Sequence, residues 1–196
     1  MVLKLWGISI TEIGKEKLDP KKQYVFSSNH RSYLDALITG SIIPNYIKFI
    51  GKAEILKWPI LGYLLKKLYI PVERDNKLGR AWSLEQLYIK AREGASMVIL
   101  PEGTCNMGPS LLKHFHDGAF RLAIDEKLPM AIMTIIGAGE LWPRNQILIR
   151  PGKILVYWDY LEITEEFTSI EKLEALKDKV RTIMLTHLIQ HYPSGY

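Results

Sequence analysis

The 196 residues are 47% hydrophobic and 24% charged, which is typical of a globular chain and excludes a disordered one. The net charge of +5 suits an anionic partner, such as a phosphate-bearing substrate or a lipid surface, but the basic residues are too scattered for a nucleic-acid-binding protein. The single cysteine, Cys105, excludes an internal disulfide and fits a reducing compartment.

The first third of the chain begins with an ambiguous stretch, residues 1–20, which fits either a strand or an amphipathic lead-in. An alternating run at 23–27 predicts a short strand, and apolar residues at spacings of three and four predict a helix over 32–43. A second short strand is predicted at Tyr46–Ile50.

Residues 55–69 are strongly apolar, with aromatic and lysine side chains interleaved. This mixture is typical of a helix that lies in a membrane interface. A buried helix pair broken at Pro59 fits the same residues equally well, so both interpretations stay open.

The middle of the chain alternates between strands and helices. Tyr69–Val72 is predicted as an edge strand because it contains a proline, and Asn76 is predicted to cap a helix over Lys77–Glu93. Met97–Leu100 is a short apolar run, typical of a strand buried on both faces. The apolar face expected for the capped helix consists of Leu78, Ala81, Trp82, Leu87, Tyr88 and Ala91.

The last part of the chain contains a predicted helix at 110–126 and a predicted strand at Met130–Ile136. Residues 147–150 and 153–158 are interpreted as a hairpin turned at the Pro-Gly between them. The tail, Ile170–His191, has the pattern of an amphipathic helix.

Strands that alternate with helices predict a single three-layer α/β domain over 1–196, with a mixed, partly parallel sheet flanked by helices. The motif-bearing core covers about 24–139, and the hairpin and amphipathic helix occupy 140–196. In such sheets the functional loops gather at the carboxyl ends of strands, which is where His30, Arg74 and Glu102 are expected.

His30 and Asp35 are the first candidate site residues. A loop histidine whose second ring nitrogen is bonded to a carboxylate is a suitable general base. Ser32 and Asp35 also fit a capping box at the start of the predicted helix, which would leave His30 an ordinary loop residue. The local pattern alone does not choose between the two.

Four short motifs follow one another along the chain: Asn29-His30 with Asp35, Ile70-Pro71-Val72-Glu73-Arg74, Pro101-Glu102-Gly103-Thr104, and Leu128-Pro129-Met130. The ordered set resembles the glycerophospholipid acyltransferase family, which includes the lysophosphatidic acid acyltransferases. Gly51-Lys52-Ala53-Glu54 is also similar to family members, so the resemblance runs from about Tyr24 to Gly139.

Two of the motifs depart from the family pattern. The second motif has Glu73 where the family usually has Asp, and Cys105-Asn106 follow Pro-Glu-Gly-Thr where the family usually has Arg. The second change removes a cation from near the expected phosphate site, so the acceptor headgroup stays open.

The resemblance implies a glycerol-3-phosphate acyltransferase-like fold and the transfer of a fatty acyl group from acyl-CoA or acyl carrier protein to a lysophospholipid hydroxyl. The acceptor that it favours is 1-acylglycerol-3-phosphate. His30 would be the base and Asp35 would orient its ring, as in triad logic with a substrate nucleophile. The residues that would bind the acceptor and its phosphate are Arg74, Lys52, Glu102, Gly103 and Thr104.

No cofactor is implied, and no metal, since His114 and His116 have the wrong spacing for two ligands on one helical face. Cys105 has no evident base partner in the sequence and is interpreted as a small, partly buried residue. The alternatives are a thioester or ester hydrolase in which His30 activates water, and a non-catalytic lipid-binding module.

The longest uncharged run, Leu128–Gly139, is shorter than the ~18–20 apolar residues of a membrane span, and no signal-peptide pattern is present. We therefore expect a cytoplasmic protein that is peripheral on the inner face of the membrane, where residues 55–69 contact the lipid surface.

Overall fold

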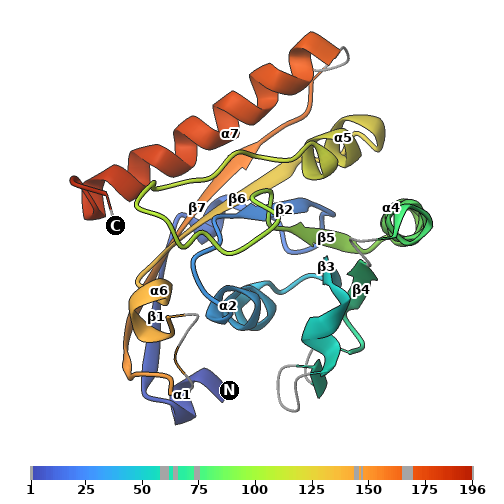
Figure 1. Ribbon diagram of the computed structural model, residues 1–196. Coiled ribbons are helices and arrows are strands. Elements are labelled where there is room, and N and C mark those ends of the chain that lie inside the picture. Colours follow the sequence, from blue (N-terminus) through green and yellow to red (C-terminus); the bar gives the residue numbers. More distant parts are fainter. Residues whose placement is uncertain are drawn as a thin grey trace.

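Figure 1 shows the computed structural model, which describes residues 2–57, 62–63, 66–72, 76–143, 146, 148–164 and 170–195. Its seven-stranded sheet has the order β1-β7-β6-β2-β5-β3-β4. The strands are β1 (Ile8–Ile13), β2 (Val25–Ser28), β3 (Ile47–Lys52), β4 (Tyr69–Val72), β5 (Ser96–Ile99), β6 (Met130–Ile136) and β7 (Gly152–Leu161). All neighbouring pairs are parallel except β6 and β7, so β1 and β7 run opposite to the other five strands.

Helices cover both faces of the sheet (Figure 1). They are α1 (Val2–Leu5), α2 (Leu34–Ile42), α4 (Lys77–Arg92), α5 (Gly118–Asp125), α6 (Ala138–Leu141) and α7 (Ile170–His191), with short 3-10 turns η1 (Lys15–Lys17) and η2 (Ala53–Lys57). One apolar core lies between the sheet and α4, α5 and α7, and a second lies between the sheet and α1, α2 and α6. The predicted three-layer α/β fold is confirmed.

The two cores explain why the central strands are apolar throughout. Successive side chains of a strand point to opposite faces, so Val25 enters one core while Phe26 enters the other. All seven residues of β6 are buried in this way. The second core includes Trp158, which is 1% exposed and packs edge-on against Phe26 with ring centroids 6.2 Å apart.

Several predicted elements are confirmed closely. The strand at 130–136 and the helix at 170–191 have the predicted bounds. Strand β4 lies at the edge of the sheet, as its proline requires. Asn76 caps α4, because its side-chain oxygen accepts a hydrogen bond from the Leu78 amide at 3.0 Å.

The ambiguous N-terminal stretch contains a short helix, α1, and then the edge strand β1, so both of its interpretations hold for different residues. Residues 55–69 cannot be judged as a whole. Residues 55–57 end the turn η2, whereas 58–61 and 64–65 lie outside the described residues. The interfacial helix therefore stays a prediction.

Two predictions are wrong. The helix predicted at 110–126 starts only at Gly118, because the backbone before it bonds elsewhere: the Lys113 amide donates to Glu102 and the His116 amide donates to the Pro101 carbonyl. The predicted hairpin is also absent from the described residues. Instead, β7 is one long strand that pairs with β6 on one side and with β1 on the other.

Helix α4 does not have the single apolar face that the sequence indicated. Leu87 and Ala91 are 1% and 3% exposed, but Leu78 and Trp82 are 80% and 50% exposed. Leu78 and Leu87 are nine residues apart, which at about 100° per residue places them on opposite sides of the helix. One apolar face therefore packs on the sheet and the other faces outward.

Truncating a side chain on one face of α4 should lower the free energy of unfolding more than truncating one on the other face. We expect Leu87→Ala to lower the free energy of unfolding by about 2–5 kcal/mol, because it leaves a cavity in a packed core. Leu78→Ala should change it by less than about 0.5 kcal/mol, because that side chain is solvated. Urea denaturation of both variants tests this, and equal losses would contradict the assignment of the faces.

Candidate active site

The candidate site lies at the edge of the sheet where β2, β3, β4 and β5 end. A cavity of about 450 Å³ opens there, and its lining includes His30 from the loop after β2 and Pro101 and Gly103 from the loop after β5. Apolar side chains of the strands, such as Phe49 and Ile99, form much of the remaining wall. The parallel direction of these strands brings their carboxyl ends together.

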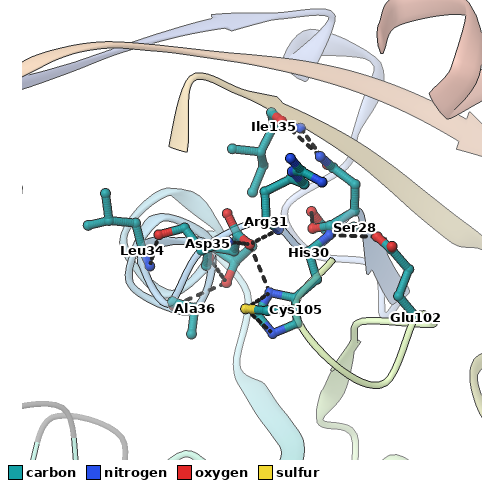
Figure 2. A network of polar contacts seen from close by, with 12 residues as sticks. Ser28, His30, Arg31, Leu34, Asp35, Ala36, Glu102, Cys105 and Ile135 are labelled. Carbon is teal, nitrogen blue, oxygen red and sulfur yellow. Dashed lines mark hydrogen bonds and ion pairs between the residues drawn. The ribbon is translucent and has the colours of Figure 1, made fainter. Parts of the chain in front are cut away.

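His30 and Asp35 meet as the sequence suggested. The Nδ1 atom of His30 lies 2.8 Å from Oδ2 of Asp35, and Figure 2 shows the imidazole directed toward this carboxylate. Asp35 is 1% exposed and lies in the first turn of α2, while His30 precedes the helix. Since Nδ1 donates to the carboxylate, Nε2 is the ring nitrogen that remains to accept a proton.

The reciprocal hydrogen bonds of the capping interpretation are also present, although Tyr33 rather than Ser32 occupies the N-cap position of α2. The Leu34 amide donates to Oγ of Ser32 at 3.2 Å, and the Ser32 amide donates to Oδ2 of Asp35 at 2.9 Å. The Arg31 amide reaches the same carboxylate oxygen at 2.8 Å. One aspartate therefore opens the helix and orients the histidine, and the two interpretations are not exclusive.

The environment of His30 favours its charged form. Burial lowers the pKa of His30, but the hydrogen bond and the negative charge of Asp35 outweigh this effect, and contact with Cys105 acts in the same direction. The net result is a pKa raised above the usual value of about 6.5. This direction favours the imidazolium over the neutral imidazole.

Cys105 is closer to the base than the sequence indicated. Its side chain is buried, and Sγ lies 3.3 Å from Nε2 and 3.5 Å from Nδ1 of His30 (Figure 2). A sulfur in the ring plane at these two distances would overlap the carbon between the nitrogens, so the thiol lies over the ring face. The nitrogen lone pair lies in the ring plane, so the thiol is not placed to pass its proton to Nε2.

Glu102 was predicted to bind the acceptor, but its carboxylate is buried. Its side chain is 2% exposed, and its two oxygens accept hydrogen bonds from the His30 and Lys113 amides, each at 2.8 Å. Burial raises the pKa of Glu102, although these two amide bonds lower it. The carboxylate thus ties the loop of His30 to the loop after β5 and positions the base.

Asn29 holds the same loop from the other side. Its side chain donates to the Ile135 carbonyl at 2.9 Å and accepts from the Ile135 amide at 2.8 Å. These two bonds extend the pairing of β2 with β6 by one residue beyond the strand. His30 therefore follows a residue fixed to a buried central strand.

Gly103 and Thr104 line the cavity, but their amides bond within the loop, and their predicted binding of the acceptor stays a prediction. The Gly103 amide donates to the Leu100 carbonyl at 2.9 Å, and the Thr104 amide donates to the Glu102 carbonyl at 2.8 Å. Gly103 has a φ of 67°, and a Cβ there would lie 2.8 Å from the His116 ring. The glycine is therefore required by the turn and by its contact with His116.

Of the two cations predicted to bind the acceptor, the structure describes Lys52 but not Arg74. Lys52 lines the cavity at the end of β3, where its Nζ lies 3.1 Å from a carboxylate oxygen of Glu54. Both side chains are about half exposed, so this ion pair is weak. Arg74 and Glu73 lie outside the described residues, so the phosphate-binding role of Arg74 stays a prediction.

Two further cations near the site were not predicted. Lys113 donates from Nζ to Oγ1 of Thr104 and to the Cys105 carbonyl, at 3.1 and 3.0 Å. Arg181, in α7, donates to the carbonyl of Lys113 at 2.6 Å. No local pattern indicates either contact, since Lys113 was placed inside a helix and Arg181 is far away in the chain.

Solved structures confirm the fold. The acyltransferase PlsC of Thermotoga maritima, described as a 1-acyl-sn-glycerophosphate acyltransferase, superposes with a TM-score of 0.79. The match covers 96% of this chain and 74% of that one, at 19% sequence identity.

Curated relatives carry similar names. A 1-acyl-sn-glycerol-3-phosphate acyltransferase of Limnanthes alba is 27% identical over 96% of this chain and 66% of its own length. A chloroplastic enzyme of that name from Brassica napus is 32% identical over 72% of this chain and 43% of its own. A lyso-ornithine lipid O-acyltransferase of Rhizobium meliloti is 30% identical over 55% and 36%. The chain spans 60 to 66% of the length of the first three such relatives.

The family model described as Acyltransferase matches residues 9–136. These residues include the His30–Asp35 pair, the loop of Glu102 and most of the cavity wall. The match covers well over half of the 196 residues, and the chain therefore belongs to the acyltransferase family.

Proposed function

We propose that the protein transfers a fatty acyl group from an acyl-CoA or acyl-carrier-protein thioester to the hydroxyl of a lysophospholipid, with 1-acylglycerol-3-phosphate as the acceptor. The observation that carries this proposal is the His30–Asp35 pair at the wall of a largely apolar cavity. Because the thiol of Cys105 lies over the ring face and away from the nitrogen lone pair, the base suits an alcohol that comes from the substrate.

The reaction follows from the geometry of the base. Neutral His30 accepts the proton of the acceptor hydroxyl at Nε2 while the oxygen attacks the thioester carbonyl. Asp35, bonded at Nδ1, holds the ring and stabilises the imidazolium that forms. Collapse of the tetrahedral intermediate breaks the carbon–sulfur bond, and the imidazolium returns the proton to the leaving thiolate.

The cavity wall suits the acyl chain of the donor. Ala36 of α2, Phe49 and Ile50 of β3 and Ile99 of β5 line it beside His30. Burying a methylene group against such side chains contributes about 0.8 kcal/mol, so several carbons of a chain are enough to position the thioester near the base.

The acceptor headgroup is the finer part of the proposal. Relatives are named for 1-acyl-sn-glycerol-3-phosphate and, in one case, for a lyso-ornithine lipid. The net charge of +5 and the position of Lys52 at the cavity favour an anionic headgroup. Arg74 follows the end of β4, the strand beside β3 in the sheet, and is proposed to contribute to the same subsite.

Among the described residues, no helix is both long and apolar enough to cross a membrane. We propose peripheral binding at the inner face of the membrane, because a lysophospholipid acceptor is presented there. The exposed aromatic side chains of Tyr63 and Trp82, which are 82% and 50% exposed, suit such a surface.

His30→Ala should lower acyl transfer by about 10²–10⁴-fold, because general-base catalysis contributes about that much. The assay is release of free thiol from acyl-CoA or acyl-carrier-protein donors in detergent micelles, with and without lysophosphatidic acid. Circular dichroism checks that the variant is folded. Thiol release that needs no acceptor would instead assign a hydrolase, and a fully active variant would refute the mechanism.

The raised pKa of His30 predicts the pH dependence. Only the neutral imidazole is a base, so kcat/KM should rise with pH above neutrality as His30 loses its proton. Asp35→Asn removes the charge that raises the pKa, so the rising limb should move to lower pH while the maximal rate falls. A limb that stays in place in Asp35→Asn would show that another group controls it.

Cys105 provides a test of direct transfer. Because its thiol lies over the ring face, Cys105→Ala should keep the rate within about threefold, and no acyl group should appear on the protein. Intact-protein mass spectrometry after mixing with acyl-CoA measures the second point. An acylated wild type together with an inactive Cys105→Ala variant would show a covalent route through this cysteine.

A further inference from the structure

Lys113 places a positive charge beside the candidate site. Its Nζ atom donates to Oγ1 of Thr104 at 3.1 Å and to the carbonyl of Cys105 at 3.0 Å, and both of these residues line the cavity. An ammonium group has three hydrogens, so two of them are used here and one remains for a further acceptor.

This charge is not neutralised within the part of the chain that the structure describes. Glu102 is a carboxylate of the same loop, but its two oxygens accept hydrogen bonds from backbone amides, one of them that of Lys113 itself. Lys52, by comparison, has an ion pair with Glu54. Lys113 therefore lies beside the cavity, in contact with two of its lining residues, and lacks a counterion among the described side chains.

The main chain of Lys113 is held firmly on two sides. Its amide is bonded to Glu102, and its carbonyl accepts a hydrogen bond from Arg181 of α7 at 2.6 Å. Arg181 also lies over the ring of Phe115, with 5.6 Å from the guanidinium carbon to the ring centroid. The loop thus carries a preorganised cation, which reduces the entropy lost when an anion binds.

We propose that Lys113 binds the phosphate of the acceptor and supplies the cation that is missing at position 105. This inference rests on the proposed function and names the residue that selects the headgroup. Cys105 links the two groups: its carbonyl oxygen binds the ammonium and its sulfur touches the ring of His30. In 1-acylglycerol-3-phosphate the phosphate is on the carbon next to the one with the reacting hydroxyl, so base and cation must be neighbours.

Coenzyme A also carries phosphate groups, and a phosphate of the donor is the other anion to consider as the ligand of Lys113. The long pantetheine arm separates the phosphates of coenzyme A from the thioester, however, whereas Lys113 and His30 contact one common residue. The acceptor phosphate therefore fits this position better than a donor phosphate does.

The test compares two acceptors that differ only in the phosphate, lysophosphatidic acid and monoacylglycerol, in wild type, Lys113→Met and Lys113→Arg. We expect Lys113→Met to lower the ratio of kcat/KM for the phosphorylated over the neutral acceptor by about tenfold or more, mainly through KM, because a charge-assisted hydrogen bond is lost. Lys113→Arg, which keeps the cation, should restore most of this ratio.

Lys22→Met is the matched control, since Lys22 is an exposed lysine before β2, at the opposite end of that strand from His30. It should leave the ratio unchanged. Equal losses with both acceptors in Lys113→Met would mean that the residue only supports the loop, and a raised KM for acyl-CoA alone would assign it to the donor. Either result would overturn the proposal.

A binding measurement separates this inference from the proposed function. The rise in the melting temperature with lysophosphatidic acid, relative to monoacylglycerol in the same detergent, needs no turnover. If wild type transfers no acyl group but shows a phosphate-dependent rise that Lys113→Met lacks, the proposed function fails and the phosphate site stands. If no such difference is seen while transfer occurs, the phosphate site fails alone.

Discussion

The candidate site depends on one carboxylate oxygen, Oδ2 of Asp35, which accepts hydrogen bonds from the ring of His30 and from the amides of Arg31 and Ser32. The amide bonds fix the turn that opens α2, and the ring bond fixes the direction of the base. A buried carboxylate is costly unless it is hydrogen-bonded, and these three donors stabilise the charge of Asp35 at Oδ2. The start of the helix and the orientation of the base are therefore one structural feature.

A second buried carboxylate extends this feature across the sheet. Glu102 accepts the amides of His30 and Lys113, and Arg181 holds Lys113 from α7. These hydrogen bonds thus join three parts of the chain, which are the loop after β2, the loop after β5 and the segment before α5. Through these bonds Glu102 holds the loop of the base, while its predicted contact with the acceptor stays a prediction.

The contact between Cys105 and His30 shows that distance alone does not define a catalytic pair. The two side chains touch, but the sulfur lies over the ring and away from the lone-pair direction. The same residue also brings its carbonyl oxygen to Lys113.

The sequence by itself determined the three-layer α/β fold, the strand at 130–136, the helix at 170–191, the cap at Asn76 and the His30–Asp35 pair, because each depends on residues close in the chain or on a regular apolar period. Only the tertiary structure decided which apolar face of α4 is buried, since Leu78 and Leu87 are equally apolar and the sheet contacts just one of them. It also decided where α5 starts and that β7 joins two neighbours, because those backbone amides bond to groups remote in sequence. The tertiary structure likewise decided the positions of four site residues, Glu102, Cys105, Lys113 and Arg181. Each of them is held by a hydrogen bond or contact with a loop or helix that is distant in the sequence.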